Sequence, residues 1–103
     1  MDLIDIAQNI LRDCMGAKQG EEQLIEPDDS GLNIAQALYK GAVNLGCEAM
    51  MMVMKERELN GEEPPKAVAE AMKAADIVIC PTAKSLTHTN ARIRAAETGT
   101  RVA

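Results

Sequence analysis

Apolar positions recur at helical spacing in four stretches of the chain, and short apolar runs lie between them. In residues 2–15 apolar side chains return every three or four positions, and Gly16 follows as a helix stop. Residues 32–45 repeat this spacing and end at Gly46, a residue that favours helix C-termini. Helices are therefore predicted over residues 2–15, 32–45, 68–75 and 88–98.

The intervening apolar runs have the length and composition of strands, and they are predicted over residues 23–26, 47–54, 77–80 and 100–103. The second run contains consecutive methionines, Met50 to Met52, followed by Val53 and Met54. A strand that is apolar on both faces is typical of a central position in a helix-covered parallel sheet. We therefore expect the methionines to be core side chains that fill gaps, and not a metal-binding motif.

The predicted order is a helix, then strand and helix three times, then the opening of a last strand. This alternation indicates an α/β domain with three layers, in which a mostly parallel sheet of about four strands is flanked by helices. Such an arrangement is Rossmann-like or flavodoxin-like. The 103 residues are enough for one domain. Because the last strand stops at Ala103, we expect residues 1–103 to be the N-terminal fragment of a longer two-domain protein.

Composition excludes several classes of function. The net charge is −5, the 11 basic residues are scattered, and Tyr39 is the only aromatic residue. A nucleic-acid interface needs clustered cations or stacking aromatic side chains, so none is expected. No apolar run is long enough to cross a membrane. Three separated cysteines and an acidic N-terminus give neither a disulfide framework nor a signal peptide, which favours the reducing cytoplasm.

Candidate chemistry lies where the predicted strands end, because ligands of open parallel sheets bind at the carboxyl ends of the strands. The first such turn, residues 28–31, has one glycine and two aspartates. A dinucleotide site needs several glycines and no carboxylate facing the pyrophosphate, so this turn does not predict one. We expect Asp29 or Ser30 to cap the following helix.

The second turn, residues 82–87, is polar and leads into His88, the only histidine. Hydroxyls, an imidazole and a guanidinium at a positive helix end suit an anion such as a peptide carboxylate. The plainer interpretation is that Thr87 is the helix N-cap and His88 an exposed residue of the first turn. The candidate binding residues are Thr82, Ser85, Thr87, His88, Thr89 and Arg92.

No catalytic or metal-ligating residue is predicted in this chain. Cys80 could act as a nucleophile with His88 as its base only if the thiol were exposed and electropositive. Because Cys80 ends a buried strand, a packed and inert thiol is expected instead. One histidine and dispersed acids do not supply the convergent ligands of a zinc-type site.

Three stretches taken together resemble a known family: GEEPP at residues 61–65, ADIVICPT at residues 75–82, and SLTHTNAR at residues 85–92 running on to GTRVA at residues 99–103. This succession resembles the N-terminal domain of the aminopeptidase T family, the thermophilic metalloaminopeptidases also called leucyl aminopeptidases. The resemblance extends from about residue 32 to the end of the sequence.

The resemblance implies a cytoplasmic exopeptidase of two domains, in which two divalent metals (zinc, cobalt or manganese) activate water for attack on the N-terminal peptide bond. The metal ligands of that family belong to the C-terminal domain, so this chain alone is expected to hold no cofactor and to be inactive. Its implied partners are that domain, a peptide substrate and a second copy. The fold is also similar to that of iron-dependent enzymes that cleave hydroxypyridine rings. Two alternatives therefore stay open: a domain of such a dioxygenase, or a stand-alone module that binds a small ligand or a protein through residues 82–92.

Overall fold

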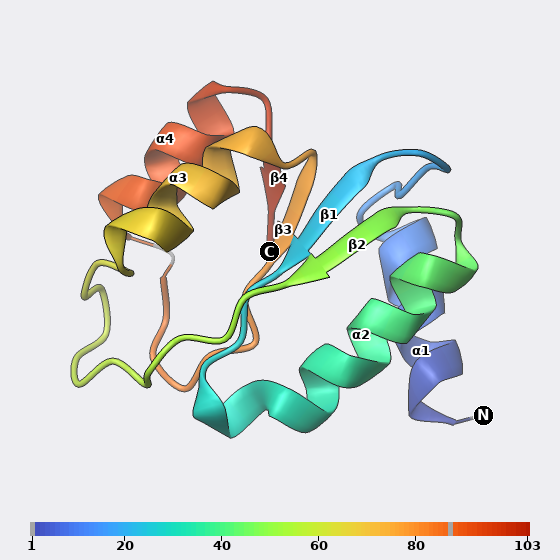
Figure 1. The fold of residues 1–103 in the computed structure, drawn as a ribbon, viewed down its shortest axis with the longest axis horizontal. Coiled ribbons are helices and arrows are strands. Elements are labelled where there is room, and N and C mark those ends of the chain that lie inside the picture. The colour runs from blue at the N-terminus through green and yellow to red at the C-terminus, as the bar shows by residue number, and fades with distance from the viewer. Residues whose placement is uncertain (1, 87) are drawn as a thin grey trace.

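A parallel sheet runs through the middle of the molecule, and helices cover both of its faces (Figure 1). The computed structural model describes residues 2–86 and 88–103, and within them the sheet has four strands in the order β2-β1-β3-β4, all paired in parallel. The strands are β1 (Glu22–Ile25), β2 (Glu48–Met51), β3 (Ile77–Ile79) and β4 (Arg101–Val102). The predicted three-layer α/β class with a parallel sheet is confirmed.

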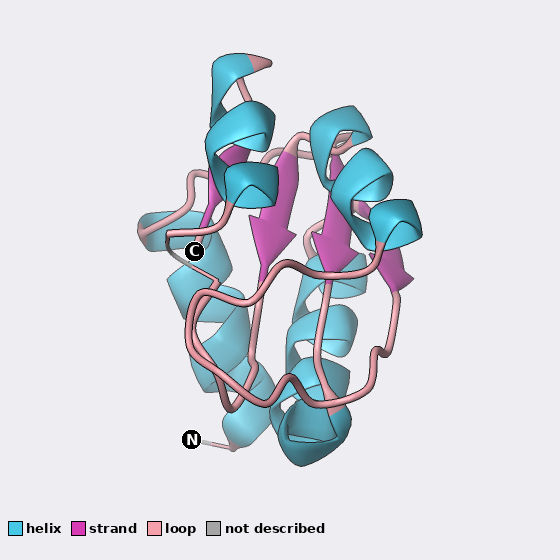
Figure 2. Ribbon diagram, turned by 90° about the vertical axis from the view of Figure 1, so that its left-hand side faces the viewer, coloured by secondary structure: helices cyan, strands magenta, loops and turns pink. Residues whose placement is uncertain are grey.

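The helices form two pairs on opposite faces of the sheet. They are α1 (Leu3–Asp13), α2 (Leu32–Asn44), α3 (Lys66–Ala74) and α4 (Asn90–Glu97), with a short 3₁₀ turn η1 (Asp29–Gly31) before α2. Helices α1 and α2 contact each other, as do α3 and α4, and Figure 2 shows the sheet between the two pairs. No helix among the described residues is long and apolar enough to span a membrane.

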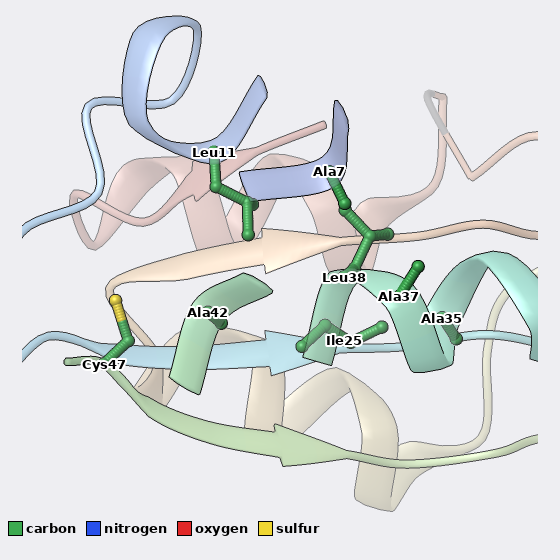
Figure 3. Close-up of a cluster of buried hydrophobic side chains, with 8 residues drawn as sticks. All are labelled: Ala7, Leu11, Ile25, Ala35, Ala37, Leu38, Ala42 and Cys47. Atoms are coloured by element: carbon green, nitrogen blue, oxygen red, sulfur yellow. The ribbon is translucent and has the colours of Figure 1, made fainter. Parts of the chain in front are cut away.

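Neighbouring residues of β1 point into two different cores because side chains alternate across a strand. Ile25 packs with Leu11 and Leu38 of the α1–α2 layer (Figure 3). Leu24 packs with Met72 and other side chains of the α3–α4 layer. The central strands are therefore apolar on both faces, as helix-covered parallel strands usually are.

The methionine-rich run does not form the central strand that its apolar character predicts. It forms β2, which pairs only with β1 and lies at the edge of the sheet. Met50 is 42% exposed, Met51 37% and Val53 50%. The expectation that the run is core was therefore wrong for these residues, although Met54 is buried. An edge strand buries less of each side chain, and apolar composition alone does not show whether a strand has one neighbour or two.

The order in which the chain adds strands to the sheet reverses after β2. From β1 it moves outward to β2, and the connection through α3 then returns it past β1 to β3. The point between the carboxyl ends of β1 and β3 is the topological switch point, where ligands bind in many open α/β sheets. The two turns selected from the sequence meet at this edge.

Candidate functional site

The switch point itself is filled by the buried side chain of Asp28. Its carboxylate accepts hydrogen bonds from the backbone N–H of Ser30 at 2.9 Å and of Ala83 at 2.7 Å. Burial opposes ionisation of Asp28, but the hydrogen bonds from Ser30 and Ala83 outweigh it, so the pKa of this carboxyl lies below its ordinary value. Asp28 caps η1, and the prediction that Asp29 or Ser30 supplies the cap was wrong.

Backbone contact also closes the crevice between the β1 and β3 turns. A Cβ atom added to Gly31 would lie 1.9 Å from the carbonyl oxygen of Pro81, so only a residue without a side chain fits there. The turn after β1 and the turn after β3 therefore touch directly. This contact, together with the Asp28–Ala83 hydrogen bond, leaves no room for a pyrophosphate at the switch point.

A cavity of about 180 Å³ lies beside the closed crevice, between the turn after β3 and helix α4. Its lining residues are Cys80, Thr82, Ser85, Leu86, Arg92, Val102 and Ala103. Arg92 is half-buried, and its guanidinium makes no hydrogen bond or ion pair that joins it to another described residue. Thr82 donates its hydroxyl proton to the carbonyl of Lys84 at 2.7 Å, so its Oγ1 is left as an acceptor. The site thus combines one cation, the hydroxyls of Thr82 and Ser85, and apolar walls.

The N-terminus of α4 is not open to an external anion, whose binding there was one of the two interpretations of the sequence. The carboxylate of Glu63 accepts hydrogen bonds there from the backbone N–H of Asn90 at 2.7 Å and of Ala91 at 3.1 Å. The N–H of Arg92 donates to Oγ1 of Thr89 at 3.2 Å. The positive end of the helix is therefore already neutralised by a carboxylate of this chain.

Helix α4 begins two residues later than predicted, at Asn90, with Thr89 as its N-cap. The predicted start at His88 was therefore wrong, and His88 is an exposed residue ahead of the helix. The hydroxyl of Thr89 is buried and also donates to the carbonyl of Leu86 at 2.7 Å, so it is structural. The alternative cap, Thr87, lies outside the described residues.

The structure brings together only part of the predicted binding set. Thr82, Ser85 and Arg92 line one cavity. His88 and Thr89 do not line it. Residues 82–92 therefore contribute both to the wall of a cavity and to the cap of a helix. The polar composition of these residues does not show which of them has which role.

Glu26 is a functional candidate that the sequence analysis did not select. It follows β1 directly and its side chain is 0% exposed, yet neither carboxylate oxygen has a hydrogen-bond partner among the described residues. Burial, and then the negative charge of Asp28, raise the pKa of Glu26 to about 7, while Arg57 opposes the rise. In the sequence, Glu26 could have been noticed as a carboxylate beside apolar strand residues, but the sequence did not reveal that its side chain would be buried.

Cys80 does not have the environment of a nucleophile. Burial, with a further contribution from Glu26, raises the pKa of its thiol to about 12, and Arg92 only partly opposes this. At neutral pH the group is therefore a protonated S–H, whereas nucleophilic attack requires a thiolate.

The aminopeptidase resemblance assigns the pair of divalent metals to a C-terminal domain and not to the residues of this chain. Residues 2–86 and 88–103 contain no group of three or more histidines, cysteines or acids placed to hold an ion. At the switch point, Asp28 already accepts hydrogen bonds from Ser30 and Ala83. No metal-dependent step is therefore assigned to residues of this chain.

Comparison with known proteins supports the fold. No family model matches the chain, and no curated protein sequence matches it. Among solved structures, it is similar to 2,5-dihydroxypyridine dioxygenase from Pseudomonas putida KT2440, with a TM-score of 0.80 and 15% sequence identity. The match covers 97% of this chain and 32% of that enzyme, so this chain spans about a third of the enzyme's length.

Proposed function

We propose that this chain is the N-terminal, non-catalytic α/β domain of a metal-dependent enzyme similar to the aminopeptidase T family. The parent enzyme would release N-terminal amino acids from peptides, with two divalent metals held by its C-terminal domain. The part of the proposal that makes this chain one domain of a longer enzyme is supported by the structural match, in which 97% of the chain corresponds to 32% of that enzyme. The family assignment itself rests on the sequence stretches at residues 61–65, 75–82 and 85–103.

The exposed apolar side chains of α1 and α2 support the idea that this domain packs against a partner. Leu3 of α1 is 50% exposed, and on α2 Ile34 is 53% and Val43 50% exposed. A groove of about 300 Å³ runs over the same two helices. Val43 lines this groove together with Ile4 and Tyr39. Exposed apolar side chains along a groove are typical of an interface, either with the rest of the parent protein or with a second copy.

Two other functions are each favoured by one observation. The solved structure that this chain resembles is a dioxygenase, which favours a domain of an iron-dependent ring-cleaving enzyme. The cavity lined by Thr82, Ser85 and Arg92 favours a module that binds a small ligand. The second function is compatible with the main proposal, because a domain can bind a ligand without catalysing its conversion.

The purified 103-residue chain is expected to show no aminopeptidase activity. Hydrolysis of leucine p-nitroanilide in the presence of cobalt, zinc or manganese should equal that of a control with metal alone. The physical reason is that two-metal catalysis needs a set of convergent ligands, and the described residues offer none. The same chain with iron(II) and 2,5-dihydroxypyridine tests the dioxygenase alternative, and it is likewise expected not to consume the substrate.

Release of p-nitroaniline above the metal control would contradict the proposal if it were lost in His88→Ala. That result would place a catalytic residue within this chain. Activity that His88→Ala leaves unchanged, and that a second chromatographic step removes, would come from a contaminating peptidase.

A further inference from the structure

The cavity beside α4 contains a cation that forms no ion pair with another described residue. Arg92 lines it, is half-buried, and has no carboxylate partner among the residues that the structure describes. The nearby carboxylate of Glu63 is bound to backbone N–H groups at the helix start. A partly desolvated guanidinium gains most from a planar oxyanion that accepts two parallel hydrogen bonds.

The other polar groups of the cavity restrict the ligand further. The hydroxyl of Thr82 donates its proton to the carbonyl of Lys84, so its Oγ1 can only accept a hydrogen bond from a ligand. Ser85 contributes a second hydroxyl and Cys80 a neutral thiol, and Leu86 and Val102 contribute apolar surface. A fitting ligand therefore carries a hydrogen-bond donor close to its anionic group, and an apolar part of small size.

We propose that this cavity binds a small monocarboxylate with an adjacent hydrogen-bond donor, such as a 2-hydroxy acid. The carboxylate pairs with the guanidinium of Arg92, and the donor meets Oγ1 of Thr82. The volume of about 180 Å³ suits such a ligand, because a cavity of about 150 Å³ accommodates a molecule of about six heavy atoms. The inference goes beyond the proposed domain role, because it assigns a ligand to this cavity.

The surrounding charges favour a monoanion over a phosphate. Among the described residues that line the cavity, Arg92 is the only cation, and Ala103 adds the terminal carboxylate of the 103-residue chain. The carboxyl of Glu26 lies within electrostatic reach of Cys80 in the cavity wall, and Asp28 is in turn close to Glu26. A dianion would be repelled by these acids and would find a single positive charge to neutralise it.

Backbone amide NMR of the labelled 103-residue chain, titrated with L-lactate, tests the proposal. We expect saturable shifts at the amides of Ala83 and Leu86. Acetate lacks the donor and should bind about fivefold more weakly. Lactamide lacks the negative charge and should cause no saturable shift, and inorganic phosphate should bind more weakly than lactate.

The matched variants are Arg92→Gln and Arg94→Gln, which remove the same charge from the same helix. Arg94 is exposed and does not line the cavity. Arg92→Gln should weaken lactate binding at least about tenfold, and Arg94→Gln should change it by less than about twofold. If Arg92→Gln loses the native amide spectrum, Arg92→Lys replaces it, and binding should weaken because lysine cannot form the two parallel bonds.

Three results would overturn the inference: no saturable shift with lactate, tighter binding of phosphate than of lactate, or equal losses in the Arg92 and Arg94 variants. None of these would affect the proposed domain role, because that role rests on the structural match and the sequence resemblance.

Discussion

At pH 8 the Glu26→Gln variant is expected to be more stable than the native chain by about 3 kcal/mol. The carboxyl of Glu26 is fully buried and has no hydrogen-bond partner among the described residues, so its charged form is disfavoured in the folded state. Glutamine has nearly the same shape but never ionises, so the variant avoids the cost of a buried charge. Burial without a partner is the physical origin of this expected gain.

The pH dependence of the native chain follows from the same residue. The pKa of Glu26 rises from an ordinary 4.5 to about 7 on folding, so the folded chain binds more protons than the unfolded chain between these values. The free energy of unfolding should therefore be highest below about pH 4.5, fall as pH rises, and level off above about pH 7, as far as Glu26 contributes. The charged or titratable groups that interact with Glu26 are Asp28, Arg57 and Cys80.

Urea unfolding of native chain, Glu26→Gln and Glu22→Gln at several pH values measures this effect. Glu22 is the first residue of β1, the strand that Glu26 follows, and its side chain is exposed, so its variant should differ from the native chain by less than about 0.5 kcal/mol. The fall between pH 4.5 and 7 should be much reduced in Glu26→Gln only. An equal fall in all three proteins would show that other groups cause it.

Gly31→Ala is expected to destabilise the chain by about 3 kcal/mol, or to prevent folding. The added methyl group would lie 1.9 Å from the carbonyl oxygen of Pro81, and the clash is with backbone, which cannot rotate away as a side chain can. The turns after β1 and β3 would have to separate. Separation would also strain the hydrogen bond from the N–H of Ala83 to Asp28.

Gly20→Ala is the matched control for this substitution. Gly20 has a positive φ of 87° and nothing within 4 Å of the added Cβ, so its cost comes from backbone conformation alone and should be about 1 kcal/mol. Gly31 has a negative φ of −106°, so its cost comes from the contact with Pro81. If thermal unfolding showed Gly31→Ala to be as stable as Gly20→Ala, the two turns would not be in contact as described.

Local pattern was sufficient to predict the class of fold. The spacing of Ala35, Leu38 and Ala42 places them on one buried face of α2, as expected from the helical repeat. The apolar run of β3 likewise becomes a central strand with Ile77 and Val78 buried. These features depend on neighbours in the sequence, so the sequence reveals them directly.

Features that depend on distant residues could not be predicted in this way. The path of the chain after β2 decides whether this strand is central or at the edge of the sheet. The apolar character of Met50 is the same in either position, so it cannot distinguish them. The start of α4 is fixed in part by Glu63, which lies 27 residues before Asn90 and binds its N–H. A threonine at position 87 or 89 is an equally good cap by residue type alone.

The sequence identified residues 82–92 as the candidate site, but it did not show which of their side chains come together. Because α4 begins at Asn90, His88 precedes the helix that carries Arg92. Arg92 lines the cavity, while His88 is exposed to solvent. Glu26 became a candidate only when its burial and its lack of a partner were known.

The most direct test of the central claim is the reading frame and the mass of the native gene product. The proposed role predicts that the coding sequence continues beyond Ala103 into a second domain that holds several histidines and glutamates, and that the native mass exceeds the 11.1 kDa of this chain. A native protein that ends at Ala103, with that mass, would contradict the claim that this chain is the non-catalytic part of a larger enzyme.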